Sequence, residues 1–290
     1  MSPRRILVAG AGYVGARLGE VLAARGDEVL CVRRSSEGLP QSVTPISADL
    51  TDRAALGGIG GKLDALVFSA GPGESTPEAY RRTYVHTLGC VLDAFAERAR
   101  RVLFVSSTAV YAQADGGWVD ESSPAAATHF SGATLLEAEA LLHARRPDAV
   151  VLRLGGIYGP GRASLVAALA RGEATLGPGD EHFVNRFHRE DCAGALAFLV
   201  DLAEPARLYL GVDDEPASRR EVMSYIAARL GVPSPSPSAE TVTRPRRGGS
   251  HKRCSNARLR AAGYVLTYPT YREGYAALVD ELERSVSPRA

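Results

Sequence analysis

Short, wholly apolar runs alternate along this chain with longer stretches in which apolar residues recur every three or four positions. The short runs are rich in β-branched and aliphatic side chains, which is typical of strands buried on both faces. They predict strands at residues 6–9, 28–32, 44–50, 63–71, 102–107, 149–154 and 208–212. The longer stretches have the period of amphipathic helices. They predict helices ending at Gly26, at residues 51–57, 76–100, 131–145, 164–171, 190–202 and 256–262, and from residues 218 and 271 onward.

Strands that alternate with helices form parallel βαβ units with right-handed crossovers. The pattern therefore predicts an α/β fold, a Rossmann-type doubly wound parallel sheet with a small C-terminal substrate lobe. The alternation loosens after Gly161. We expect a dinucleotide-binding Rossmann core at residues 1–155 and a mixed region at residues 156–290, which completes the sheet and builds the lobe. In that region Ser218 opens a helix with capping-box spacing, and residues 232–250 are expected to form a surface loop.

Composition narrows the choice of partners. The chain has 290 residues and a formal charge of +1, which gives no reason to expect nucleic acid or a membrane surface as a partner. Its four cysteines are far apart, so we expect reduced thiols, a cytoplasmic protein and no metal site. Of the 34 basic residues only Lys62 and Lys252 are lysines, so an arginine is a weaker functional signal here than usual.

A glycine pattern follows the first predicted strand. Gly10, Gly12 and Gly15 have the G-x-G-x-x-G spacing of a dinucleotide-binding turn, and Tyr13 and Val14 begin the next helix. Gly10 would make the sharp turn, Gly12 would let the backbone approach a pyrophosphate, and Gly15 would let the helix lie close to the strand. A helix N-terminus offers free N–H groups and a positive dipole end to phosphates. The alternative is a plain glycine turn, which the flanking strand and helix disfavour.

The end of the second strand indicates the cofactor. An acidic residue there binds the ribose 2′-hydroxyl of NAD, whereas arginine pairs with the 2′-phosphate of NADP. This chain has Arg33, Arg34 and Ser35, which predict NADP(H); the alternative is a solvated turn in an arginine-rich protein. After the third strand, Asp49 and Leu50 are predicted to contact the adenine. After the fourth strand, Ser69, Ala70 and Gly71 are predicted to lie beside the ribose and pyrophosphate.

Several motifs together resemble the extended short-chain dehydrogenase/reductases, which include nucleotide-sugar epimerases and dehydratases. They are the opening glycines, Ala48-Asp49-Leu50, Ser106-Ser107-Thr108-Ala109-Val110-Tyr111, Gly155-Gly156-Ile157-Tyr158-Gly159-Pro160-Gly161 and Arg186-Phe187-His188-Arg189-Glu190-Asp191. The resemblance covers nearly the whole chain. The spacing of the opening glycines is similar to that of the family's atypical members. The resemblance also implies a homodimer formed through helices at residues 76–100 and 131–145.

The resemblance implies a catalytic serine or threonine, a tyrosine, and a lysine four residues after the tyrosine that lowers the pKa of the phenol. Ser107 matches the serine. Aligned on Ala138-Glu139, Ser131 occupies the tyrosine position and Leu135 the lysine position. No Tyr-x-x-x-Lys occurs anywhere in the chain. The usual proton relay is therefore absent, which leaves the fold intact and the reaction open.

Other groups could replace that relay. Tyr111 follows a sheet strand and His129 precedes the altered helix, and we place both with Ser107 as candidate catalytic residues. His86, Tyr158 and His188 are weaker candidates, with ordinary structural roles favoured for each. Glu137 and Glu139 are expected on solvated helix faces, and Asp120-Glu121 in a helix cap or solvated turn.

The sequence thus favours an NADP(H)-dependent oxidoreductase or epimerase acting on a small polar, sugar-like substrate. A second interpretation is a non-catalytic NADP(H)-binding sensor or regulatory protein. A third is a dehydratase or isomerase that keeps the dinucleotide tightly bound.

Overall fold

Seven parallel strands form one sheet in the described part of the chain, in the order β11-β7-β5-β4-β1-β2-β3. The structure is a computed structural model that describes residues 3–177, 179–236 and 251–286. The strands are β1 (Arg5–Ala9), β2 (Glu28–Arg33), β3 (Thr44–Ser47), β4 (Leu63–Phe68), β5 (Ala99–Ser107), β7 (Val150–Leu154) and β11 (Leu208–Gly211). Strand order reverses between β1 and β4, which gives a topological switch point. The predicted doubly wound parallel sheet is confirmed.

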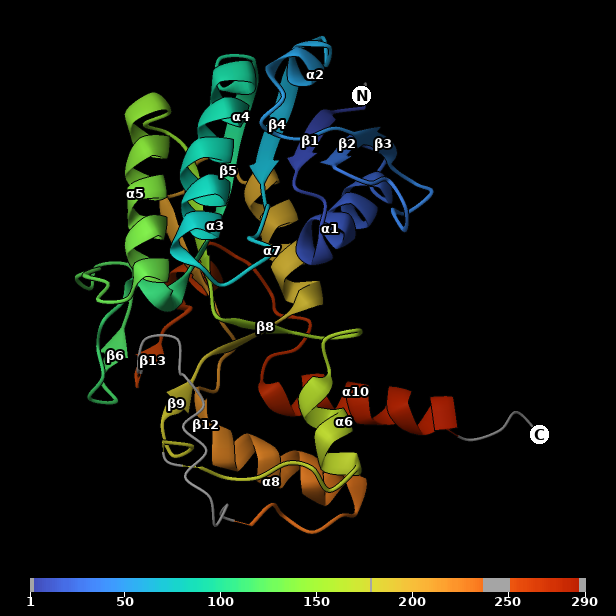
Figure 1. Ribbon diagram of the computed structural model, residues 1–290, viewed down its shortest axis with the longest axis vertical. Coiled ribbons are helices and arrows are strands. Elements are labelled where there is room, and N and C mark those ends of the chain that lie inside the picture. The colour runs from blue at the N-terminus through green and yellow to red at the C-terminus, as the bar shows by residue number, and fades with distance from the viewer. Residues whose placement is uncertain (1–2, 178, 237–250, 287–290) are drawn as a thin grey trace.

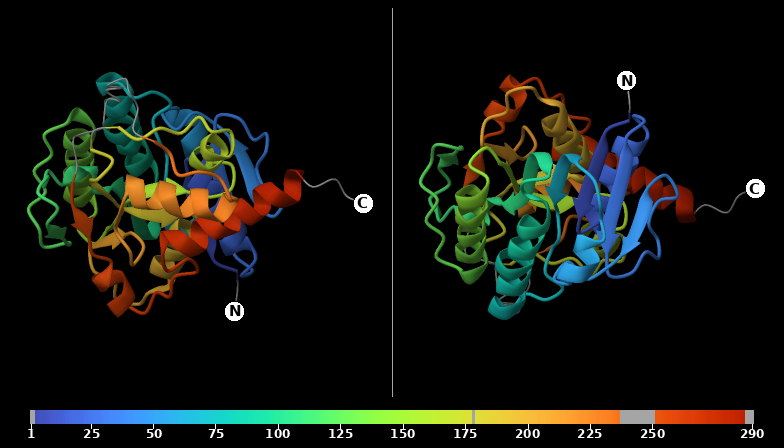
Figure 2. Two further views of the ribbon diagram at one scale, coloured as in Figure 1. Left: turned by 90° about the horizontal axis from the view of Figure 1, so that it is seen from below. Right: turned by 90° about the horizontal axis from the view of Figure 1, so that it is seen from above.

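Helices cover both faces of this sheet (Figures 1 and 2). Helices α1 (Tyr13–Ala23) and α7 (Arg189–Asp201) pack on one face around Leu18 and Leu196. The other face is covered around Phe95 and Leu135 by helices α4 (Leu88–Phe95) and α5 (Phe130–Arg145), with the short helix α2 (Arg53–Gly57) beside them. Because both faces are buried, the central strands are apolar almost throughout.

The single helix predicted for residues 76–100 is wrong. The structure has α3 (Pro77–Arg81), a π-helical turn η1 (Arg82–Thr87) and then α4, and strand β5 already begins at Ala99. The Thr87 hydroxyl donates to the Arg82 carbonyl over 2.8 Å, five residues back, which fits the wider π turn. Apolar periodicity alone does not register such an insertion.

A smaller lobe lies beyond the carboxyl ends of the strands (Figure 1). Helices α6 (Ser164–Ala170), α8 (Arg219–Leu230) and α10 (Tyr271–Val286) share its core around Met223 and Tyr271. The predicted capping box at Ser218 is confirmed, since Ser218 and Glu221 exchange side-chain to backbone hydrogen bonds of 3.1 and 2.6 Å. The division of the chain at residue 155 stays a prediction. Residues 237–250 of the predicted loop lie outside the described residues.

Short elements connect the layers. They are η2 (Thr108–Val110), α9 (Ala257–Ala261) and three two-stranded pairs: β8 (Gly156–Tyr158) with β10 (Arg186–His188), β9 (Phe183–Val184) with β12 (Ala217–Ser218), and β6 (Trp118–Val119) with β13 (Arg253–Cys254). The last pair brings residues that follow position 250 next to the loop after η2. None of the helices described here is long and apolar enough to cross a membrane.

Candidate functional site

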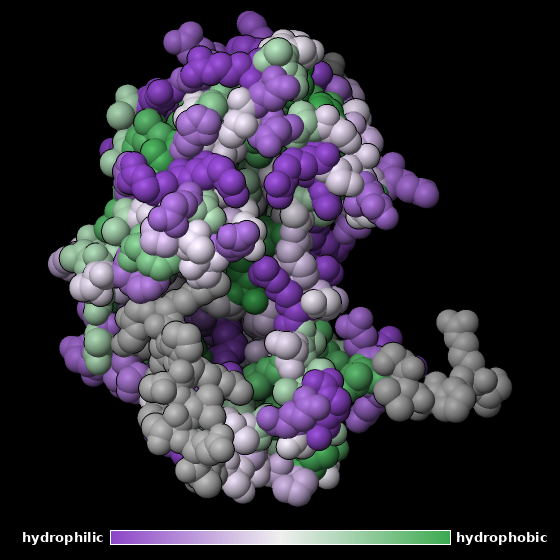
Figure 3. All heavy atoms as spheres, in the orientation of Figure 1, coloured by the Kyte–Doolittle hydropathy of each residue, from purple (hydrophilic) through white to green (hydrophobic). Residues whose placement is uncertain are grey.

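A cavity of about 1580 Å³ lies between the carboxyl ends of the sheet strands and the lobe. Figure 3 shows the molecule hollowed there, with hydrophilic side chains around the hollow. Sites for one drug-sized ligand usually measure roughly 300–1,000 Å³. This cavity is therefore large enough for two ligands, and its position matches the rule that open α/β sheets bind ligands at the switch point.

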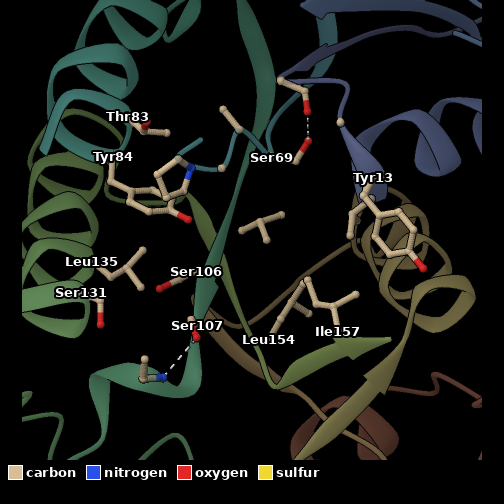
Figure 4. A pocket seen from close by; sticks show the side chains of 18 of the residues that line it. Tyr13, Ser69, Thr83, Tyr84, Ser106, Ser107, Ser131, Leu135, Leu154 and Ile157 are labelled. Carbon is tan, nitrogen blue, oxygen red and sulfur yellow. Dashed lines mark hydrogen bonds between the residues drawn. The ribbon is translucent and has the colours of Figure 1, made fainter. Parts of the chain in front are cut away.

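The turn after β1 forms one end of the cavity. Gly10 has φ +92°, and a Cβ there would lie 2.4 Å from the Ala70 backbone, so only glycine fits. The Ser69 hydroxyl donates to the Gly10 carbonyl over 2.9 Å and holds the turn (Figure 4). A Cβ on Gly12, by contrast, would meet nothing within 4 Å, so its open side faces free space. Gly15 does not line the cavity; a Cβ there would lie 2.5 Å from Ser69 Oγ.

Helix α1 begins at this turn without a side-chain cap. The first N–H groups of a helix have no partner within it, so they are free to bind an anion. The Tyr13 hydroxyl donates to the Pro160 carbonyl over 2.9 Å, and the Arg162 guanidinium lies 4.7 Å from the Tyr13 ring. Tyr13, which lines the cavity, thus joins α1 to the turn after β8.

Cationic side chains follow strand β2. Arg33 is half-buried with Nη1 3.5 Å from the Ala11 carbonyl, and Arg34 is exposed. Asp49, after β3, accepts hydrogen bonds from the Thr51 hydroxyl and N–H at 2.7 and 2.8 Å. These bonds lower the pKa of Asp49, and the charge of Arg34 lowers it further, so Asp49 is anionic near neutral pH.

Of the thirteen predicted cofactor residues, all except Gly15 line this one cavity. An uncapped helix N-terminus, an open Gly12 and two arginines form a donor set that suits a dinucleotide with an extra phosphate. That these residues bind it stays a prediction.

Ser107 ends strand β5 and lines the middle of the cavity. Its hydroxyl oxygen accepts a 3.2 Å hydrogen bond from the Ala109 N–H and caps η2, which leaves the hydroxyl proton available (Figure 4).

A buried ion pair lies next to the end of β5. Arg153 donates to both Glu139 carboxylate oxygens, over 3.0 and 2.6 Å, and the Ser106 hydroxyl donates to the same carboxylate over 2.6 Å. The expectation that Glu139 is solvated is wrong, since Glu139 is only 7% exposed. Glu137 is exposed as expected and pairs with Arg81.

Tyr111 belongs to the same network and not to the cavity. Its hydroxyl donates to the Asp120 carbonyl over 2.9 Å and accepts from Arg153 over 2.8 Å, and its residue is 2% exposed. Burial raises the pKa of Tyr111, although Arg153 opposes the rise. Tyr111 is absent from the cavity lining among the described residues, so the structure does not bring it to Ser107 as a catalytic group.

Helix α5 presents Ser131 and Leu135 to the cavity (Figure 4). The predicted alignment places these two residues at the tyrosine and lysine positions of the usual relay. His129 precedes them, half-buried and outside the lining, with Nδ1 2.8 Å from the Ser131 hydroxyl.

The weaker histidine candidates lie elsewhere. His86 is exposed on η1 and outside the lining. His188 is 2% exposed, caps α7 through Nδ1 and does not line the cavity. Burial lowers the pKa of His188 to about 4, so it is neutral near pH 7.

The far half of the lining includes a lysine that the sequence did not mark as a site residue. Lys252 directly precedes β13, is 2% exposed, and donates from Nζ to the Tyr111 carbonyl over 3.0 Å. Burial lowers the pKa of Lys252. Arg162, Arg186 and Arg219 join it, so this half is cationic. Arg186 belongs to a motif that carries the family resemblance, whereas no local pattern marks Lys252, Arg162 or Arg219; the fold brings the four side chains together.

Comparisons with known proteins agree with this geometry. The model of the NAD-dependent epimerase/dehydratase family matches residues 6–198. A solved structure from Methylobacillus flagellatus, described as a candidate NAD-dependent epimerase/dehydratase, is 34% identical with a TM-score of 0.80, covering 97% of this chain and 100% of that one. Protein YeeZ of Escherichia coli K12 is 29% identical over 251 residues, 80% of this chain and 86% of its own.

Two ligand-bound structures share the fold at lower identity. MoeE5 in complex with UDP-glucose and NAD is 24% identical with a TM-score of 0.82, covering 98% of this chain and 100% of that chain. The human epimerase family protein SDR39U1 with NADPH is 22% identical with a TM-score of 0.78, covering 95% and 99%. At these identities the likeness concerns the fold alone.

Proposed function

We propose that this chain, which belongs to the NAD-dependent epimerase/dehydratase family, is an NADP(H)-dependent oxidoreductase or epimerase. Its proposed substrate is a small polar, sugar-like molecule. The observation that carries this proposal is that one continuous cavity borders both sets of residues. It runs from the Gly12 turn and Arg33 past Ser107 to the cationic lobe, with room for a dinucleotide and a second molecule.

The near end of the cavity is proposed to hold the dinucleotide. The N-terminus of α1 and Gly12 would face its pyrophosphate, Arg33, Arg34 and Ser35 its 2′-phosphate, and Asp49 with Leu50 its adenine. Ser69, Ala70 and Gly71 would lie beside its ribose and pyrophosphate. When bound, the dinucleotide supplies or accepts a hydride at the substrate carbon.

Ser107 is proposed to hydrogen-bond the substrate oxygen at which charge develops. The Ser107 hydroxyl supports this role, because it accepts from the Ala109 N–H on one lone pair and can still donate its proton to a substrate oxygen. We leave Tyr111 out of the catalytic set because its hydroxyl already donates to the Asp120 carbonyl and accepts from Arg153. The polar and cationic lobe lining suits a substrate with several hydroxyl or acidic groups, as UDP-glucose has in the MoeE5 complex.

The rival proposal is an NADP(H)-binding sensor without turnover. Leu135 favours it, because an apolar side chain replaces the lysine that activates the usual tyrosine. In both proposals the protein binds a nicotinamide dinucleotide.

One purified sample distinguishes the two. We expect NADPH to bind with enhanced fluorescence, and absorbance at 340 nm to change with at least one member of a panel of sugar and small carbonyl or hydroxyl compounds. Tight NADPH binding with no change across the panel would favour the sensor. Absence of any dinucleotide binding would rule out both.

A further inference from the structure

At the start of helix α5, a side chain that lines the cavity contacts a histidine that does not line it. Ser131 is 4% exposed and lines the cavity, and its Oγ lies 2.8 Å from His129 Nδ1. The Ser131 backbone N–H points at the same nitrogen over 3.3 Å. A nitrogen that accepts from a backbone N–H carries no proton of its own. The Ser131 hydroxyl therefore donates to Nδ1, and its oxygen lone pairs are left for a ligand in the cavity.

His129 contacts Ser131 but does not itself line the cavity. Its ring is half-buried and packs on Phe130 with centroids 4.3 Å apart. Ser131 thus borders the cavity, and the imidazole that it contacts is partly exposed to solvent.

The charged groups on elements packed against α5 are engaged with one another. Arg81 of α3 pairs with Glu137, and Arg153 of β7 pairs with Glu139. Lys252 donates to the Tyr111 carbonyl beyond η2. Among described residues, His129 is the titratable group in direct contact with Ser131.

We propose that the Ser131 hydroxyl and the His129 imidazole form a proton relay between the substrate oxygen and solvent, which replaces the missing tyrosine and lysine. The inference rests on the proposed function. In the oxidative direction the substrate hydroxyl proton moves to Ser131 Oγ, while the Oγ proton moves to His129 Nδ1. His129 then releases a proton from Nε2 to water. In the reductive direction the same two transfers run backwards, and the substrate oxygen receives the Ser131 proton.

The competing explanation is that His129 only caps α5, since Nδ1 is also the helix N-cap acceptor. The two roles separate by substitution. Asparagine is a good N-cap residue but cannot exchange protons near neutral pH. His129→Asn therefore keeps a structural cap and removes a relay. Ser131→Ala removes the hydroxyl, and Ser131→Thr keeps one.

The first test needs neither cofactor nor substrate. In ligand-free protein labelled with ¹⁵N-histidine, we expect His129 to carry its proton on Nε2, with an Nδ1 resonance typical of a hydrogen-bond acceptor; loss of the signal in His129→Asn assigns it. Ser131→Ala should shift this Nδ1 resonance, and Ser131→Thr should restore it. An Nδ1 resonance that does not respond to Ser131→Ala overturns the relay.

The second test uses whichever substrate the panel identifies. Ser131→Ala and His129→Asn should each lower kcat about 10²- to 10⁴-fold with a smaller change in KM, and His129→Asn should remove the pH dependence of kcat below neutrality. Free imidazole should partly restore the rate of His129→Ala. His86→Asn, at an exposed histidine outside the cavity, is the matched control and should leave kcat unchanged.

The outcomes separate the relay from the proposed function. A wild type that turns substrate over, with Ser131→Ala and His129→Asn equally fast, overturns the relay and leaves the oxidoreductase standing. An inactive wild type overturns both. A kcat loss in His129→Asn that is matched by a lower melting temperature and an unchanged pH profile assigns His129 to capping alone and overturns the relay.

Discussion

At the scale of single residues, the proposed cofactor end of the cavity depends on charge and on the absence of side chains. Arg33 ends β2 and Arg34 follows it, and neither forms a salt bridge within the described part of the chain: Arg33 lies 3.5 Å from the Ala11 carbonyl, and Arg34 is exposed. Gly10 and Gly12 differ sharply although they are two positions apart, because one is crowded by the backbone and the other faces open space.

If Arg33 and Arg34 hold the 2′-phosphate, Arg33→Ala or Arg34→Ala should weaken NADPH binding about ten- to a hundredfold, since a charge-assisted pair contributes roughly 1.5–3 kcal/mol. NADH, which lacks that phosphate, should bind unchanged. Calorimetry on both cofactors measures this. Arg53→Ala is the control, because Arg53 is exposed on α2, pairs with Asp93 and lies outside the cavity. Equal affinity of the wild type for NADPH and NADH would contradict the assignment.

The glycine turn gives a second residue-scale prediction. Gly12→Ala should abolish or strongly weaken dinucleotide binding and leave the melting temperature nearly unchanged, because the new methyl group meets nothing in the protein itself. Gly10→Ala should instead lower the melting temperature, since its Cβ would overlap the Ala70 backbone at a positive φ. Fluorescence titration and thermal denaturation separate the two effects. Undiminished binding by Gly12→Ala would reduce the turn to a packing feature.

At the scale of elements, the part of the cavity lined by Ser107 and Ser131 depends on how α5, β5 and β7 are fixed to one another. The Arg153–Glu139 pair joins β7 to α5, Ser106 ties the end of β5 to the same carboxylate, and Tyr111 extends the network to the loop after η2. Side chains that line the cavity from α5 and from β5 therefore share one buried support.

Glu139→Gln should lower the free energy of unfolding by about 3–5 kcal/mol, because it leaves the buried Arg153 guanidinium without its counter-charge. Glu137→Gln, two residues earlier on the same helix, should cost less than about 1 kcal/mol, since its pair with Arg81 is exposed. Urea denaturation of the two variants gives the comparison. Similar losses in both would mean that the buried pair is not the main support.

At the scale of the whole molecule, two buried groups contribute to the pH dependence of stability in opposite directions. Burial raises the pKa of Asp213 to about 8, although the charge of Arg186 opposes the rise. Burial lowers the pKa of His188 to about 4. The folded protein thus binds the Asp213 proton more tightly than the unfolded chain does, and the His188 proton less tightly.

Between about pH 6.5 and 8 Asp213 is protonated in the folded protein and ionised in the unfolded chain, so its contribution to stability should fall by up to about 1.4 kcal/mol per pH unit as pH rises. From about pH 6.5 down to 4 the contributions of Asp213 and His188 oppose each other and nearly cancel. Asp213→Asn should remove the loss above pH 6.5. It should also expose the His188 effect, so that this variant loses stability as pH falls from 6.5 towards 4.

Urea denaturation at several pH values tests this. Asp214→Asn is the control, because the Asp214 carboxylate pairs with Arg260 at the surface. A wild type whose stability is constant from pH 6.5 to 8 would show that Asp213 titrates in the folded protein as it does in the unfolded chain.

The sequence by itself determined the parallel sheet, most of its helices and a group of residues that line one end of the cavity. Those features are local: an apolar run, a glycine spacing and two arginines at a strand end fix strand, turn and charge within a few residues. Buried strands such as Val150–Leu154 were therefore predictable, and so was the capping box at Ser218. The π turn in η1 was not, because apolar spacing tolerates one inserted residue.

Only the tertiary structure decided the chemistry of the other half. Glu139 and Glu137 look equivalent in sequence, yet Glu139 is buried beside Arg153 of β7 and Glu137 is exposed to solvent. Lys252, just before β13, reaches the cavity from more than a hundred residues after Ser107. Burial, ion pairing and convergence on one cavity depend on contacts between distant segments, and no pattern within a short window records them.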